Sequence, residues 1–136
     1  MSLSALLRSA RSLLLIDAAT CLAMGAILLA AGDAVAGLTA LDPALLFWAG
    51  VLLLPIGAYM ALAALGPRVA PFHLGVIVAG NFLWVLASVA VLAVGAANGP
   101  GIAFVGVQAV AVAVLGGLEL RALAGGGGPA AAVAKQ

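Results

Sequence analysis

Charged residues are scarce in this chain of 136 residues, because Lys, Arg, Asp and Glu together make up only 7% of it. A soluble globular chain carries roughly a quarter of its residues as these four types. With 67% hydrophobic residues and a mean hydropathy of +1.37, the surface of a folded domain could not be kept in water. A formal net charge of +1, without a dense basic stretch, also excludes nucleic acid as a partner.

Cysteine and histidine are nearly absent, with Cys21 and His73 the single examples of each. One cysteine permits no internal disulfide, and one histidine without a nearby second ligand does not make a metal site. The sequence contains no HExxH, GxSxG or phosphate-loop motif and no Ser/His/Asp set. It therefore predicts a protein that is not an enzyme and that holds no cofactor or metal.

Long apolar stretches fill the rest of the chain. Each reaches the length of about 20 residues that a helix needs to cross a bilayer. Short connections between them force neighbouring helices to run antiparallel. The sequence thus predicts an all-α polytopic membrane protein, an up-down-up-down bundle of four transmembrane helices in one domain (1–124), followed by a Gly/Ala-rich tail (125–136). The expected helices are 12–32, 43–65, 71–96 and 101–123.

Turn signals separate the apolar stretches. Asp42-Pro43 is typical of a helix start, with Asp42 as the N-cap and Pro43 in the first turn. Asn98-Gly99-Pro100-Gly101 is a dense turn signal before the last helix. The segment 33–42 is expected to be a loop between the first two helices.

The basic residues all fall on one side of the predicted bundle. Lys and Arg in short flanking segments face the cytoplasm in most membrane proteins. The opposite connections contain no Lys or Arg, and one of them contains Asp33 and Asp42. Both termini are therefore expected in the cytoplasm, on the side of Arg8, Arg11, Arg68, Arg121 and Lys135.

Small residues on the third predicted helix favour close helix packing. Lipid is as apolar as leucine, so helices in a bilayer associate through close backbone approach and interhelical hydrogen bonds. A small-xxx-small pair precedes a row of residues at four-residue steps that share one face, with a small notch beside the Trp84 ring. The residues of this expected packing surface are Gly75, Ala79, Gly80, Trp84 and Ser88.

Four polar side chains fall within the expected spans, in the inner half or near the middle of the membrane: Asp17, Tyr59, Asn81 and Gln108. One interpretation is structural: Pro55 frees the carbonyl of Val51, and the Asn81 amide satisfies it. The other is that Asn81 and Gln108 line a polar path.

Asp17 is the acidic residue that lies most clearly inside a span, and two interpretations remain open. It reaches the interface and pairs with Arg121 or Arg11, or it titrates as a proton or cation site. Glu119 and His73 are expected at the inner rim, in contact with water.

Two segments carry a resemblance to a known group of proteins. Asn81-Phe82-Leu83-Trp84-Val85-Leu86-Ala87-Ser88, with Leu15-Ile16-Asp17-Ala18-Ala19 upstream, resembles small four-helix bacterial integral membrane proteins of uncharacterised function. The resemblance implies a multi-pass protein of the bacterial inner membrane. It implies no activity and no catalytic residues.

Two functions are compatible with the sequence. The first is a non-catalytic accessory, scaffold or assembly component of the membrane, which packs against itself as a homo-oligomer or against a larger membrane complex. The alternative is a small transporter or an ion- or proton-conducting oligomer that uses Asp17, Asn81 and Gln108. In both, the lipid bilayer is the surrounding partner.

Overall fold

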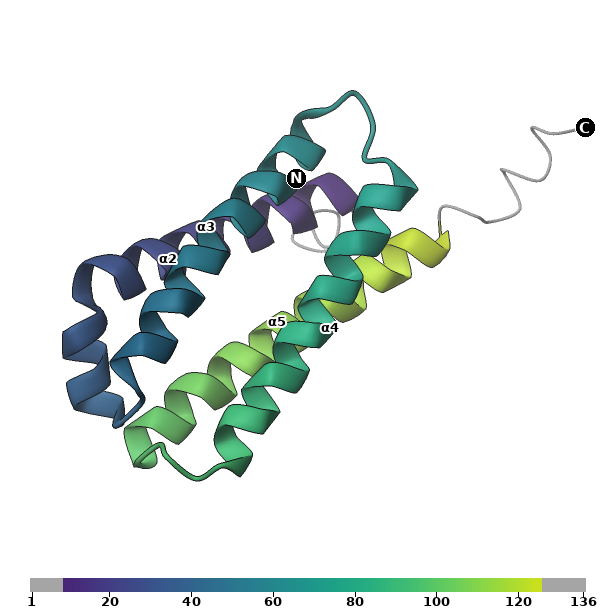
Figure 1. Ribbon diagram of the computed structural model, residues 1–136. Coiled ribbons are helices and arrows are strands. Elements are labelled where there is room, and N and C mark those ends of the chain that lie inside the picture. Colours follow the sequence, from purple (N-terminus) through teal and green to yellow (C-terminus); the bar gives the residue numbers. More distant parts are fainter. Residues whose placement is uncertain (1–8, 126–136) are drawn as a thin grey trace, which may run out of the picture.

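The computed structural model describes residues 9–125, which fold into four antiparallel helices (Figure 1). They are α2 (Ala10–Thr39), α3 (Pro43–Leu65), α4 (Pro71–Ala93) and α5 (Gly99–Gly125). Each is long and apolar enough to cross a membrane, and the described residues contain no strand. The predicted fold class is confirmed. Arg8, Lys135 and the predicted tail beyond Gly125 lie outside the described residues.

Short polar side chains and a glycine set several helix ends. Asp42 Oδ1 accepts a hydrogen bond of 2.8 Å from the Ala44 amide, so α3 begins at Pro43 as expected. Asn98 Oδ1 accepts one of 2.9 Å from the Gly101 amide, and α5 begins two residues before the predicted position. Helix α4 ends at Ala93, three residues early, because the chain turns at Gly95 with φ +70°.

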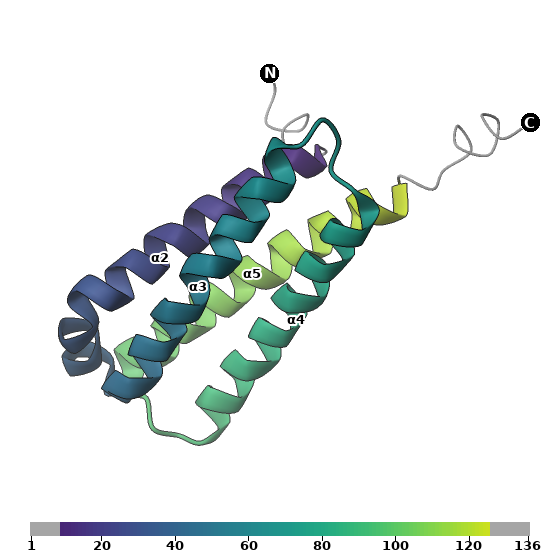
Figure 2. The same cartoon turned by 45° about the horizontal axis from the view of Figure 1, so that its top comes forward.

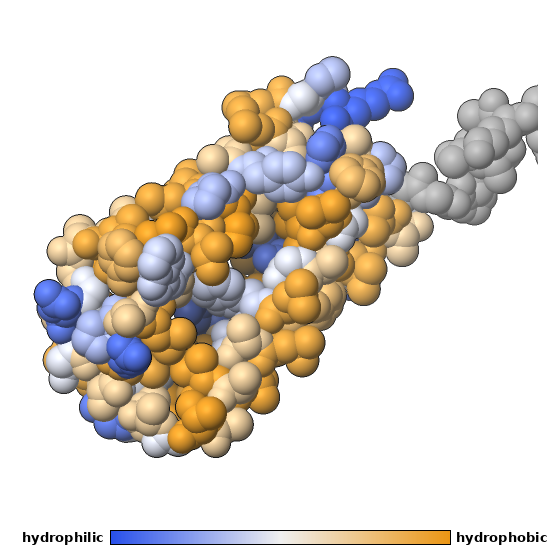
Figure 3. All heavy atoms as spheres, in the orientation of Figure 1, coloured by the Kyte–Doolittle hydropathy of each residue, from blue (hydrophilic) through white to orange (hydrophobic). Residues whose placement is uncertain are grey.

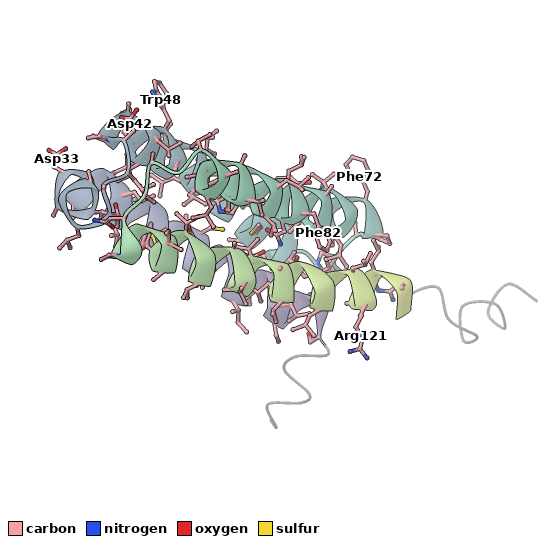
Figure 4. The ribbon with its side chains drawn as sticks, turned by 90° about the horizontal axis from the view of Figure 1, so that it is seen from below. Asp33, Asp42, Trp48, Phe72, Phe82 and Arg121 are labelled. Atoms are coloured by element: carbon pink, nitrogen blue, oxygen red, sulfur yellow. The ribbon has the colours of Figure 1, made fainter. Side chains whose placement is uncertain are left out.

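Helix α2 is longer than the sequence indicated. It passes Gly32 through a kink at Ala31 (φ −131°, ψ 21°) and continues to Thr39, where Ala40 ends it with left-handed φ 57°. The predicted loop over 33–42 is therefore wrong, since a glycine weakens a helix by only about 1 kcal/mol and does not stop it. Figures 1 and 4 show the last turns of α2 bent away from its main axis, with Asp33 on their outer side.

The closest helix packing lies between α2 and α3, where glycines face each other. A Cβ on Gly50 would lie 3.2 Å from the Gly25 carbonyl oxygen, and one on Gly57 would lie 2.8 Å from Leu22 Cγ. Gly25 and Gly50 let the two backbones approach because neither carries a side chain, and Gly57 makes room for the Leu22 side chain. Helices α2 and α3 therefore form a tightly packed hairpin.

The α4/α5 hairpin joins the first hairpin mainly through α2 and α5. Helices α3 and α4 hardly contact each other along their lengths (Figures 1 and 2). We call the end of the bundle with Arg11, Arg68 and Arg121 the basic end, and the opposite end, with Asp33 and Asp42, the acidic end. At the basic end, Arg11 Nη2 donates to the carbonyl oxygens of Gly66 (2.7 Å) and Pro67 (3.1 Å), fixing the start of α2 to the α3–α4 connection.

At the acidic end, the α4–α5 connection docks on the end of α2. The Asn98 backbone N–H donates to the Thr39 carbonyl oxygen at 3.1 Å, and the Asn98 side-chain nitrogen, Nδ2, donates to the Leu38 carbonyl oxygen at 3.0 Å. These carbonyls belong to the last turn of a helix, where no intrahelical donor is available. Gly101 lies against the Thr39 carbonyl so closely that a Cβ there would overlap its oxygen.

We expect Gly101→Ala to destabilise the bundle by about 1–3 kcal/mol, the usual cost of forcing an extra methyl group into a packed position. The added Cβ meets a backbone oxygen that cannot rotate away. Gly99→Ala is the matched control, because a Cβ there meets nothing within 4 Å. Unfolding in detergent measures both, and equal midpoints for the two variants would contradict the docking of α5 on α2.

Candidate intramembrane polar site

One amide joins two carboxyl groups inside the bundle. Asn81 Nδ2 on α4 donates to Asp17 Oδ2 on α2 at 2.7 Å and to Glu119 Oε2 on α5 at 2.8 Å. The three side chains are buried, with 1% of Asp17, 5% of Asn81 and none of Glu119 exposed. We call them the carboxyl–amide cluster. The cluster connects three of the four helices.

Helix register brings the two carboxyl groups to a similar depth, and Asn81 reaches both of them from α4. Asp17 and Glu119 each lie roughly two turns, or about 10 Å, from the end of their helix nearest the basic end. Gly116 lies almost one turn before Glu119 on α5, and a Cβ on Gly116 would lie 3.2 Å from Asn81 Cβ. The missing side chain at Gly116 lets α5 approach α4 at Asn81.

Two neighbours on α2 complete the surroundings of Asp17. The Cys21 thiol donates a long hydrogen bond of 3.7 Å to Asp17 Oδ1, and the Thr20 hydroxyl donates to the Asp17 backbone carbonyl at 2.8 Å. The second carboxyl oxygen of Glu119, Oε1, is buried and has no hydrogen-bond partner among residues 9–125. The cluster therefore has one acceptor that the described protein atoms do not use.

No positively charged side chain compensates the two carboxyl groups within the described residues. Their side-chain partners are Asn81 and Cys21, both neutral donors. Arg11 is engaged with backbone carbonyls, and Figure 4 shows Arg121 pointing away from the bundle. The predicted pairing of Asp17 with Arg11 or Arg121 is thus absent. Two positions apart on a helix means nearly opposite faces, so Arg121 points outward because Glu119 points inward.

The expectation that Glu119 meets water at the inner rim is wrong, since its side chain is fully buried. Its position near the end of α5 gave the depth but not the direction in which it points. The sequence does contain a signal that could have found it. Glu119 follows Gln108 by about three helical turns, so the two share one side of α5.

Asn81 does not bond the Val51 carbonyl, contrary to the expectation from Pro55. Its amide nitrogen donates to the two carboxyl groups instead. Helix α3, which carries Val51, hardly contacts α4, so that carbonyl is not a near neighbour of Asn81.

Tyr59 and His73 form a separate polar contact nearer the basic end. The Tyr59 hydroxyl is hydrogen-bonded to His73 Nδ1, and the two rings meet edge to face. This bond links α3 to α4 where the helices otherwise hardly touch. His73 is therefore half-buried against Tyr59 and not simply hydrated at the rim, as the sequence had suggested.

A cavity of about 780 Å³ lies beside the cluster, lined by residues of all four helices. Asn81 and Cys21 belong to its wall, whereas Asp17 and Glu119 lie behind them. Gln108 and Tyr59 line the cavity and are not part of the cluster. Figure 3 shows this face of the molecule hollowed between the two hairpins, with hydrophilic atoms deep in the hollow.

The residues of the expected packing surface on α4 lie in several environments. Gly80 and Trp84 line the cavity, and a Cβ on Gly80 would meet nothing within 4 Å. Ser88 is buried and donates to the Trp84 carbonyl at 2.8 Å. Ala79 is exposed, and the nearest contact of a Cβ on Gly75 would be Leu123 at 3.9 Å. The closest approach in the bundle occurs between other helices.

Within the part of the chain that the structure describes, no group of three or more His, Cys, Asp or Glu side chains is arranged to hold a metal ion. No protein-family model, curated protein or solved structure matches the chain. The function is therefore inferred from the geometry of the cluster and the cavity.

Asn81→Leu is expected to lower the free energy of unfolding by about 1–3 kcal/mol, because it leaves two buried acceptors without their donor. Gln108→Leu replaces another amide by leucine at a position that makes no hydrogen bond within residues 9–125, and its effect should be below about 0.5 kcal/mol. Thermal or denaturant unfolding in the same detergent compares them. Equal losses in both variants would show that the cluster does not hold the helices together.

Proposed function

We propose that this protein is a small membrane transporter or conductor that binds and releases a proton at the carboxyl–amide cluster. The observation that carries the proposal is the burial of Asp17 and Glu119 on one neutral amide, without a compensating cation among the described residues. Ionisable groups inside membrane spans are costly and are commonly part of ion or proton pathways.

The geometry of the pair supports a shared proton. Both carboxyl groups accept a hydrogen bond from the same nitrogen, Asn81 Nδ2, so they lie at one site. Two carboxylates at one site repel each other, and a proton on one of them removes this repulsion. A cluster of this kind holds one proton when closed and exchanges it, or accepts a small cation instead, when the site opens.

A purely structural role explains the cluster less well. Replacing a buried ionic group by well-packed apolar residues is often neutral or stabilising, so such groups are weak devices for stability alone. Glu119 Oε1, which has no partner among residues 9–125, and the adjoining cavity also favour a functional role over a purely structural one, because both leave room for a further partner.

The accessory or assembly role keeps one supporting observation. Helices α3 and α4 hardly contact each other, and this side of the bundle is open to a helix of another subunit. In that case the protein is a non-catalytic component of a larger membrane complex or a homo-oligomer. It purifies with a fixed partner and shows no exchange of protons at the cluster.

We further propose that the protein resides in the bacterial inner membrane with both termini in the cytoplasm. The location rests on the resemblance to small bacterial membrane proteins. The orientation rests on the gathering of Arg11, Arg68 and Arg121 at one end of the bundle.

Reporter fusions test this orientation. A reporter that is active in the cytoplasm, fused after Gln136, should be active, and one inserted in the α4–α5 connection at Asn98 should be silent. A reporter of the opposite compartment should give the reverse pattern. Activity of both fusions in the same compartment would contradict the proposed path across the membrane.

Proteoliposomes test the proton site. Under an imposed potential, vesicles with the native protein should take up protons, as a trapped pH-sensitive dye reports. Asp17→Asn and Glu119→Gln should reduce the uptake to that of protein-free vesicles. Asp33→Asn is the matched control, since it removes an exposed carboxyl from the same helix.

An infrared titration of the same samples detects the bound proton directly and does not require transport. The native protein should show the band of a protonated carboxylic acid that Glu119→Gln or Asp17→Asn removes and Asp33→Asn retains. Unchanged uptake and an unchanged band in the Asp17 and Glu119 variants would reject the proposal.

A further inference from the structure

We propose that the cavity beside the cluster binds an uncharged, lipid-soluble molecule that carries a hydrogen-bond acceptor, and that this molecule enters from the bilayer between α3 and α4. The inference goes beyond the proton site, because it rests on the cavity wall and not on the two carboxyl groups.

The cavity has the size of a small-molecule site. Its volume of about 780 Å³ falls within the range of roughly 300–1,000 Å³ typical of ligand pockets. All four helices contribute to its wall, which is mostly aliphatic and aromatic. Such walls with a few polar groups are characteristic of binding sites for apolar molecules.

The composition of the cavity wall disfavours a charged ligand. Among residues 9–125, no Lys, Arg, Asp or Glu lines the cavity. An anion meets no positive group and lies near two carboxyl groups, which disfavours it. A cation does not reach those groups directly, since Asn81 and Cys21 stand between them and the cavity. An uncharged molecule avoids the cost of losing its hydration there.

Two donors in the wall point to an acceptor on the ligand. Gln108 on α5 and Trp84 on α4 both line the cavity. Neither the Gln108 amide nor the Trp84 indole N–H donates a hydrogen bond to another group within residues 9–125. The indole can only donate, so its partner must be a carbonyl, hydroxyl or ether oxygen. A plain hydrocarbon chain would leave both donors unsatisfied in apolar surroundings.

The entrance faces lipid. Helices α3 and α4 hardly contact each other, and the Tyr59–His73 bond is a polar link between them near the basic end. Exposed side chains of Ile56 on α3 and Val76 on α4 also belong to the wall, so the cavity reaches the apolar surface of the bundle. A molecule already dissolved in the bilayer can enter without crossing water.

Trp84 provides the readout. The chain has two tryptophans, so a Trp48→Phe background leaves Trp84 as the sole reporter, and Figure 4 shows Trp48 on the outside of the bundle. The probe is a decyl-substituted benzoquinone, which is uncharged, lipid-soluble, carries two carbonyl acceptors and quenches indole fluorescence. In nanodiscs, the Trp84 emission should fall along a saturating curve, whereas dissolution in lipid alone gives no saturation.

Two glycines form a matched pair of variants. A Cβ on either Gly80 or Gly106 meets nothing within 4 Å, but only Gly80 lines the cavity. Gly80→Leu should fill the cavity and abolish saturable quenching, and Gly106→Leu should leave it unchanged. Gln108→Leu should weaken binding by about tenfold, the loss of roughly one hydrogen bond.

Several outcomes would overturn the proposal: quenching that never saturates, equal effects of Gly80→Leu and Gly106→Leu, or saturable binding of tetraphenylphosphonium in place of the quinone. A nanodisc that contains two copies of the chain, with cross-links between their α3 and α4 helices, would show that a second copy fills the cavity. Glu119→Gln should retain probe binding, so failure of this proposal and failure of the proton site are told apart.

Discussion

The bundle depends on one neutral amide that serves two acids. Asn81 donates to Asp17 and to Glu119, and so ties α4 to both α2 and α5. In lipid no water competes for these groups, and a carboxyl oxygen without a donor is costly. The cluster therefore restricts how the two hairpins can rotate against each other. Helix α3 takes no part in the cluster and is held mainly by its packing on α2, where glycines of both helices allow close approach.

The hairpins are built and joined by different kinds of contact. Within the first hairpin, close backbone approach at Gly25, Gly50 and Gly57 provides the packing. Between the hairpins, two sets of polar contacts join α2 to the second hairpin: the cluster near the basic end, and Asn98 on the last turn of α2 at the acidic end. Helices α3 and α4 are joined by the Tyr59–His73 bond near the basic end and hardly contact each other along the rest of their length. The cavity occupies the space that results.

The sequence was sufficient for the fold and for part of the site. Apolar length, turn residues and the distribution of charge predicted four spanning helices, and Asp42 correctly marked the start of α3. Asp17 and Asn81 could be singled out because polar groups are rare in such segments. Depth along the helix did not place Glu119 inward, since it does not give the face on which a side chain lies; the side of α5 that Glu119 shares with Gln108 was the signal that could have placed it. Nor could the packing surface be chosen, because small residues permit close approach on any helix, and the partner decides which ones are used.

Asn81 belongs to both the cluster and the cavity wall, and this shared position limits what its substitution can reveal. Removing its amide disturbs the two acids, the packing of α4 and the lining of the cavity at once. Glu119 lies only in the cluster, and Gly80 lies only in the wall. Changes at these two residues act on one feature each. If the acids and the cavity work together, a change at Glu119 and a change at Gly80 will not be additive, because side chains connected through a shared partner couple energetically.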